Sequence, residues 1–249
     1  MDGSRQDDVC ITLDVDWASD AVFAEALALV DELGVPVTLF CTHRTSLLDG
    51  LDPGRFEIAW HPNFLEPRGD DEIVAEMAAW FPDVLGVRSH ALYFHSRLAP
   101  LYLERGIRYL AHDLQFAQPR LAPIRHWSGL VGIPGFWEDD VHALYHAGDF
   151  DPDLVDLDSP GLKVFDFHPV HLALNTDTMD RYEAARADVE ARRSLAEHVN
   201  PGLGSRTLLR AVVERIREKP ARHRFTTVGE VARRFDRQHP YPGRYRPAD

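Results

Sequence analysis

The sequence predicts an α/β protein built as a distorted (β/α) barrel of seven or eight strands in a single domain. Short apolar runs alternate with helical segments along the chain, which is typical of βα units. The 249 residues match a length at which an α/β barrel runs as one domain. No glycine-rich phosphate turn follows the first strand, so an open dinucleotide-binding sheet is disfavoured.

The first half of the chain contains a clear strand and a clear helix. The apolar run 9–13 (VCITL) predicts a buried strand that breaks into the polar DVDW. An apolar stripe at helical spacing then predicts a helix with Ser19 as its N-cap and Gly34 at its end. The same two periods predict strands at 35–40 and 56–60 and a helix at 70–80.

The second half of the chain continues this alternation. We expect a short strand around Val87, a helix at 96–105 that stops at Gly106, strands at 107–110, 124–127 and 163–167, helices at 178–196 and 205–218, and a strand running into a helix at 225–235. Neither a linker nor an internal repeat divides the chain. One domain is therefore expected over 1–249, with a core at about 9–235 and an irregular tail at 236–249 that docks by its tyrosines.

The composition narrows the class of partner. Lys and Arg number 27 against 40 Asp and Glu, which gives a net charge of −13. An acidic surface repels polyanions, so we expect no nucleic acid and no membrane partner, but a small-molecule or glycan substrate. No signal segment and no run of 18 apolar residues is present, so a cytoplasmic protein is expected. Cys10 and Cys41 each lie in an apolar run and are expected to be buried thiols. Nothing in the sequence indicates an oligomeric state.

Polar side chains collect just after the predicted strands. In a parallel barrel the catalytic groups lie at the carboxyl ends of the strands. Thirteen histidines are present, and several follow a strand directly. Carboxylates and imidazoles together suit a divalent metal, most simply zinc, with a bound water activated for hydrolysis. The residues at these strand ends are Asp14, Asp16, His43, His61, Arg88, His90, His168 and His171.

Asp14 and Asp16 are one residue apart, so at an extended strand end both side chains point the same way. Two carboxylates that close are not easily both charged without a cation. One of them can therefore bind a metal while the other serves as a general base. The alternative is that Asp14 simply ends the strand and Asp16 caps the segment that follows.

Six segments of the chain resemble, in order, the motifs of a known enzyme family. They are TLDVDW, EIAWHPNF, GVRSHALYF, IPGFWEDD, VFDFHPVH and FTTVGEVARRF, and they extend from about residue 9 to 235. This series resembles the polysaccharide deacetylase (NodB homology) superfamily, which includes carbohydrate esterase family 4. The HPN and FHPVH variants look most like the WbmS-type branch associated with O-antigen and surface-polysaccharide loci. The resemblance implies a NodB-like barrel.

The resemblance also implies an activity and a set of roles. It makes the chain a metal-dependent hydrolase that removes an acyl group from an N-acyl amino sugar or a related small amide. Asp14 matches the general base, Asp16 and His61 match metal ligands, Arg88 matches the residue that orients the base, and His168 matches the general acid. Such a base and acid would take a proton from the attacking water and return one to the leaving amine.

One position departs from the family pattern. The second metal histidine normally lies four residues after the first, and this chain has Leu65 there. Catalytic zinc usually keeps three protein ligands, so another group must replace it if the metal is bound. His90 stands in place of the proline of the family's Arg-x-Pro segment and is the first candidate. His43 is the second, and Asn63 is a third, although an amide is a weak zinc ligand. The alternative is that His90 only hydrogen-bonds substrate or Asp16.

Several further residues are candidates for contact with substrate. Trp137 either packs as a wall of the cleft or touches the substrate. Glu138 starts an acidic run that is either a solvated helix start or contains a residue that orients His168 or Arg88. His171 supports the site or is simply at the surface. With these, the substrate-binding candidates are His43, Asn63, Trp137, Glu138 and His171.

Two other functions fit the same residues. The first is hydrolysis of another non-peptide C–N bond, since a fold alone does not determine the substrate. The second is a degenerate barrel that binds sugar without catalysis, and Leu65 is the observation that favours it.

Overall fold

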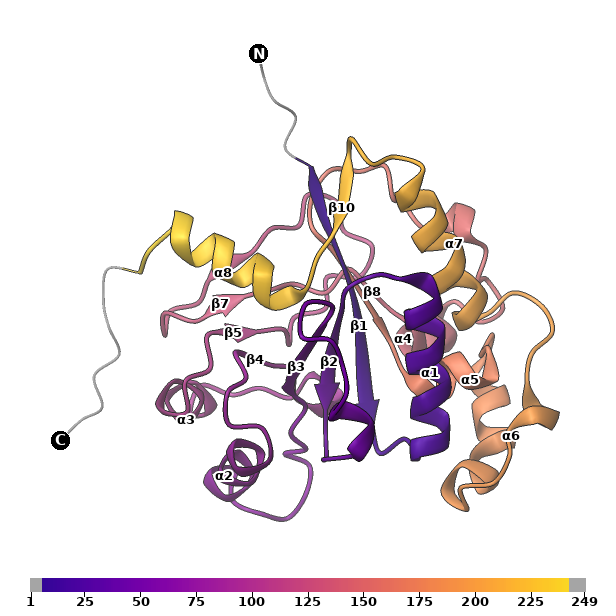
Figure 1. The fold of residues 1–249 in the computed structure, drawn as a ribbon, viewed down its shortest axis with the longest axis horizontal. Helices are drawn as coiled ribbons and strands as arrows, with labels where there is room; N and C mark the ends of the chain where they lie inside the picture. Colours follow the sequence, from indigo (N-terminus) through magenta and orange to yellow (C-terminus); the bar gives the residue numbers. More distant parts are fainter. Residues whose placement is uncertain (1–5, 242–249) are drawn as a thin grey trace.

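A curled, mostly parallel sheet forms the centre of the molecule (Figure 1). The computed structural model describes residues 6–241. The strand order is β6-β7-β5-β4-β3-β2-β1-β9-β8, with β10 beside β1, and among the strand pairs only β6–β7 is antiparallel in this part of the chain. A bridge between Leu114 and Gly135 joins the segment after β5 to the segment before β8. The sheet therefore curls into a distorted barrel, and the predicted fold class is confirmed.

Half of the ten described strands are only two residues long. The strands are β1 (Asp7–Asp16), β2 (Val37–Cys41), β3 (Phe56–Trp60), β4 (Gly86–Val87), β5 (Tyr109–Leu110), β6 (Ile124–Arg125), β7 (Val131–Gly132), β8 (Trp137–Glu138), β9 (Lys163–Phe167) and β10 (His223–Phe225). The sequence did not predict β7 or β8, because two residues carry no periodicity.

Helices surround the sheet, and all but the last of them, α8, lie on its outside. They are α1 (Asp20–Leu33), α2 (Asp70–Trp80), α3 (Leu98–Glu104), α4 (Asp139–Tyr145), α5 (Pro169–Leu174), α6 (Met179–Glu190), α7 (Ser205–Arg217) and α8 (Val228–Gln238). Ser19 caps α1, since its hydroxyl accepts from Val22 N, and Gly34 ends the helix at a φ of 60°, as predicted. The short helices α4 and α5 were not predicted, and α6 ends earlier than the predicted 178–196.

Two apolar layers hold the barrel together. One lies between the sheet and its outer helices and contains the side chains of β1 and β9 that point outward, such as Leu13 and Phe165. The other lies inside the barrel and includes Cys10, Phe40 and Tyr109. Cys41 belongs to the outer layer and Cys10 to the inner one, and both are buried free thiols, as predicted.

Helix α8 packs against the inner layer, where it contacts β1 and β7 (Figure 1). Its first backbone N–H groups donate to the sheet: Val228 N to Thr38 Oγ1 at 3.0 Å, and Gly229 N to Glu57 Oε2 at 2.7 Å. The helix runs through Gln238, so the predicted irregular tail begins later than 236. Tyr241 Oη donates to the carbonyl of Trp127, while the remaining tail residues lie outside the described part.

Along β1, side chains alternate between the two layers, so Thr12 and Asp14 point into the barrel. The carboxyl ends of β1, β3, β4 and β9 meet at one end of the barrel, which we call the mouth. Among residues 6–241, no helix is both long and apolar enough to cross a membrane.

Candidate metal centre and active site

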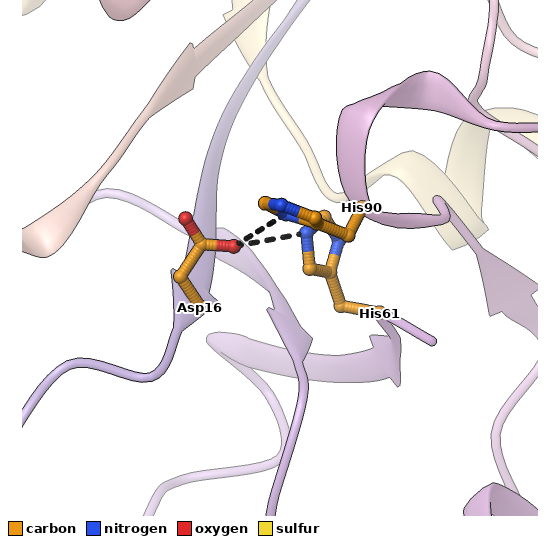
Figure 2. A group of neighbouring side chains, drawn as sticks. All are labelled: Asp16, His61 and His90. Atoms are coloured by element: carbon orange, nitrogen blue, oxygen red, sulfur yellow. Dashed lines mark hydrogen bonds and ion pairs between the residues drawn. The ribbon is translucent and has the colours of Figure 1, made fainter. Parts of the chain in front are cut away.

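Asp16, His61 and His90 converge at the mouth (Figure 2). Asp16 follows from β1, His61 comes directly after β3, and His90 follows β4. One carboxylate oxygen, Asp16 Oδ1, lies 3.2 Å from His61 Nε2 and 3.1 Å from His90 Nδ1. One oxygen and two imidazole nitrogens are a ligand set that suits a zinc-like divalent cation.

His61 is the strongest sign that these residues fit a metal. Its side chain is 2% exposed, and both ring nitrogens are buried without a hydrogen bond of good geometry to any described residue. Buried polar atoms without partners are rare in folded proteins, so a bound ion is a ready explanation. Nδ1 lies 3.5 Å from Asp14 Oδ2, and Nε2 faces Asp16.

Asp16 is held as a charged ligand. Burial alone would raise the pKa of its carboxyl group, but the adjacent imidazoles of His61 and His90 bring that pKa well below its usual range. The carboxylate is therefore ready to bind a cation at any working pH.

The backbone at Asp16 is unusual in a way that serves this geometry. The register of β1 and β2 shifts between Asp14 and Asp16, and Asp16 has a φ of 47°. Left-handed backbone is uncommon outside glycine, although aspartate tolerates it better than most residues. The kink ends the strand and turns the carboxylate toward the two histidines (Figure 2).

His90 reaches the site from a turn and not from an extended strand. It begins a short 3₁₀ segment, His90–Leu92, in which Ala91 has a φ of 54°. Its backbone N–H donates to the carbonyl of Pro62 at 3.0 Å, which ties this turn to the segment after His61. Ser89, just before this turn, is extended, and the side chains of Arg88 and His90 reach the mouth at Asp14 and Asp16 respectively.

Arg88 lies between two buried carboxylates inside the mouth. Its Nη1 is 2.8 Å from Asp14 Oδ1 and 2.6 Å from Asp166 Oδ1. Its Nε donates to the carbonyl of Ala111, and its guanidinium covers the ring of Phe40 at 4.1 Å. The guanidinium of Arg88 is therefore held by several contacts, and it holds the carboxylate of Asp14 in place.

The Asp14–Arg88 pair has a third member. Asp166 on β9 accepts from Thr12 Oγ1 at 2.5 Å, and its other oxygen is buried without a partner among the described residues. Burial and the charge of Asp14 raise the pKa of Asp166 to about 8, against the opposing effect of Arg88. The charged form of Asp166 is therefore disfavoured, although the guanidinium of Arg88 lies beside it.

His168 directly follows β9 and lies near Asp16. Its Nδ1 lies 2.8 Å from Asp139 Oδ1, and its Nε2 faces Asp16 Oδ2 at 3.9 Å. Asp139 also accepts from the backbone N–H of His168 and from Ser205 Oγ. Burial would lower the pKa of His168, but Asp140 and Asp139 raise it well above its ordinary value. The ring is thus held with a proton available at Nε2.

The other two candidates for the third ligand lie at the edge of this group. His43 Nδ1 lies 3.2 Å from the backbone carbonyl of Asp16, so it contacts the ligand's main chain and not its carboxylate. Asn63 forms its own turn, in which its Oδ1 accepts from Leu65 N and its Nδ2 donates to Glu66. Leu65 is 62% exposed.

Trp137 requires a correction. Adjacent residues of a strand face opposite sides of the sheet. Glu138 faces the mouth, so Trp137 faces the helix layer, where it is 2% exposed and packs against Phe150 and Phe167. It is neither a wall of the cleft nor accessible to a substrate. His171 is buried between His168 and Tyr182, with its Nδ1 against Thr176 Oγ1.

Three residues at the mouth were not singled out from the sequence. Asp166 was overlooked because it lies inside a predicted strand, where period-two alternation would have placed it facing inward. His112 follows β5 as the other histidines follow their strands, and its Nε2 contacts Ser89 Oγ. Trp17, next to Asp16, is 52% exposed and meets the ring of His90 edge-on at 4.9 Å.

Comparison with known proteins identifies the family of this chain. The sequence model of the WbmS-like polysaccharide deacetylases matches residues 11–186. Among solved structures, a protein of Bordetella bronchiseptica, WbmS, assigned as a polysaccharide deacetylase involved in O-antigen biosynthesis, is 35% identical. That alignment covers 83% of this chain and 90% of the other, with a TM-score of 0.77.

Two more distant structures share the fold. PuuE allantoinase is 14% identical over 97% of this chain and 94% of its own, with a TM-score of 0.59. The 4-α-glucanotransferase of Thermococcus litoralis is 13% identical over 93% of this chain and 41% of its own, with a TM-score of 0.51. No curated protein sequence matches. The family match spans more than half of the chain, and the 35% identity to WbmS spans most of it. The chain therefore belongs to the WbmS-like family of polysaccharide deacetylases.

Proposed function

We propose that this protein is a divalent-metal-dependent deacetylase that removes an acyl group from an N-acyl amino sugar of a surface glycan or its precursor. The observation that supports it best is the convergence of Asp16, His61 and His90 beside a buried Asp14–Arg88 pair and an oriented His168. Family membership supports the removal of acyl groups from sugars, and the role assigned to WbmS suggests O-antigen as the context.

Asp16, His61 and His90 would hold the metal, and zinc fits their donor atoms best. When bound there, the ion would polarise the acyl carbonyl and lower the pKa of water at the site. The side chains around it would divide the proton transfers between a base, Asp14, and an acid, His168, which have polar atoms within 4.8 Å of each other.

Asp14 is the base in this proposal. It accepts the proton of the attacking water while a C–O bond forms at the acyl carbon. Arg88 holds the carboxylate in place at 2.8 Å, so the catalytic oxygen needs no reorganisation.

His168 is the acid. Its Nε2 gives a proton to the nitrogen of the amide as the C–N bond breaks, which produces an amine and a carboxylic acid. Asp139 holds Nδ1 and so fixes which nitrogen faces the mouth.

Two exposed aromatic side chains near His90 support the proposal that the substrate is a sugar. Trp17 is 52% exposed and Tyr93 is 38% exposed. Aromatic faces at a site edge can pack against the apolar face of a pyranose ring. A cytoplasmic glycan precursor remains the predicted substrate.

The test is metal-dependent release of acetate. Purified protein would be stripped with a chelator, reloaded with zinc and incubated with N-acetylglucosamine oligomers and N-acetylated nucleotide sugars. We expect acetate release only after reloading, with zinc bound in a one-to-one ratio. Stoichiometric zinc with no release from any acetylated sugar, or release only from amides that are not sugars, would contradict the proposal.

A further inference from the structure

Glu138 is a buried carboxyl group at the mouth that the roles above leave unused. It ends β8 and is the register partner of Asp166 on β9. Its residue exposure is 8%, and the described part of the chain offers its carboxylate neither a hydrogen bond nor an ion pair. An isolated buried carboxylate is expensive to ionise without a partner. Its natural partner is therefore a group that arrives with a ligand.

Asp140 and His168 lie beside it. A carboxylate oxygen of Glu138, one of Asp140 and a ring nitrogen of His168 are all within 4.8 Å of one another. Asp166 adds an oxygen that is buried and lacks a partner among the described residues. The three carboxylates cannot satisfy one another, since carboxylates only accept hydrogen bonds when charged.

Acidic side chains outnumber basic ones at this point of the mouth. Arg88 is already shared by Asp14 and Asp166, and Asp139 is already paired with His168. Burial and the charges of Asp140 and Asp166 raise the pKa of Glu138 well above its ordinary value. A cation next to Glu138 and Asp140 would relieve this repulsion.

The kind of cation follows from the neighbouring proton donor. His168 faces the nitrogen that leaves the acyl group, so this nitrogen emerges beside the two carboxylates as an ammonium group. A metal is a weaker match, because Asp139 occupies Nδ1 of His168 and the proton transfer uses Nε2, so neither nitrogen is free to bind a metal. We propose that Glu138 and Asp140 form an ammonium-binding subsite that holds the amino group released by deacylation, an inference that rests on the proposed function.

The subsite is tested by binding, without turnover. The zinc-loaded protein would be titrated by calorimetry with glucosamine, which carries the amine, and with glucose, which has a hydroxyl group in its place. We expect glucosamine to bind at least tenfold more tightly. In Glu138→Gln and Asp140→Asn, each close in shape to the original side chain, this preference should fall at least fivefold. Asp149→Asn, an exposed acid in the loop after α4, is the matched control and should keep it.

A wild-type protein that does not distinguish glucosamine from glucose, including one that binds neither, would overturn the subsite. So would an unchanged preference in both variants, or a second equivalent of zinc that Glu138→Gln loses. Acetate release without the preference would overturn the subsite alone. The preference without acetate release from any sugar would overturn the deacetylase proposal and leave an amine-binding site.

Discussion

His90 Nδ1 lies 3.1 Å from Asp16 Oδ1, the same oxygen that lies 3.2 Å from His61 Nε2. This chain has Leu65 where the family pattern has its second metal histidine, and that leucine is 62% exposed. An imidazole from the turn after β4 thus stands beside the other two ligand candidates. The hydrogen bond to Asp16 raises the pKa of His90, as expected for a histidine next to a carboxylate. The ligand set can therefore be completed from a different strand end.

Loss of any of the three ligand candidates should remove the metal. We expect Asp16→Ala, His61→Ala and His90→Ala each to lower bound zinc at least tenfold, because a site with two ligands is incomplete. Elemental analysis of untagged protein after dialysis measures this directly. His198→Ala removes a histidine that is paired with Asp188 and half-buried, and it should retain zinc fully.

Normal zinc content in His90→Ala would show that another residue is the third ligand. His43 would then be the next residue to replace, since its ring contacts the main chain of Asp16.

Substitutions of the proposed base, Asp14, and of Arg88 should lower the rate of acetate release to different extents. Asp14→Asn should reduce the acetate release rate at least a thousandfold while most zinc is kept, because the amide has the same shape but cannot accept the proton. Arg88→Lys should reduce it roughly a hundredfold, since one ammonium cannot contact Asp14, Asp166 and Ala111 O together. Arg210→Lys, at an exposed pair with Glu32, is the control.

Rates close to those of wild type in Asp14→Asn would identify another group as the base. Circular dichroism and zinc content would show whether any loss in Arg88→Lys comes from misfolding, because that arginine is buried.

Most of the fold could be predicted because its long elements repeat with a clear period. Two examples are the predicted strand that corresponds to β1 and the helix capped by Ser19. The two-residue strand β8 could not be predicted, and this is why Trp137 was placed in the cleft: its orientation depends on which residue of the strand faces inward. Burial determines which residue of β8 faces outward, since the indole of Trp137 fits the apolar helix layer and the carboxylate of Glu138 does not.

The site could be predicted to the extent that strand ends reveal it. Strands with a clear apolar pattern are predicted just before Asp14, Asp16, His61 and His168. Their position after these strands was therefore enough to predict that they lie at the mouth. Asp166 is inside a strand, and its importance depends on Arg88, which is distant in the sequence. Contacts of this kind follow from how the barrel closes, and the linear pattern does not contain them.

Asp139 should act on the reaction through His168. It accepts from Nδ1 and the backbone N–H of His168 and from Ser205 Oγ, so it fixes the ring and its protonated nitrogen. We expect Asp139→Asn to lower kcat at least a hundredfold with little change in KM or in zinc content, because an amide can stabilise the other tautomer. Ser205→Ala removes one of the three donors and should lower kcat only severalfold. An equal loss in both variants would indicate that the group acts through packing and not through the histidine.

Glu57, at the contact between the sheet and α8, should make stability depend on pH. Its carboxylate accepts from Thr38, Tyr109 and the backbone of Gly229, yet burial raises its pKa above the ordinary value of 4.5. A carboxyl group whose pKa is raised by folding stabilises the protein while protonated, so its contribution is present below about pH 4.5 and is lost as pH rises toward the folded value. The free energy of unfolding of wild type relative to Glu57→Gln should therefore fall as pH increases from 4.5, by up to about 1.4 kcal/mol per pH unit within that window.

Urea unfolding of both proteins at several pH values measures the difference, with the exposed Glu183→Gln as a control that should follow wild type. Parallel pH profiles for wild type and Glu57→Gln would show that Glu57 ionises equally easily in the folded and unfolded chains.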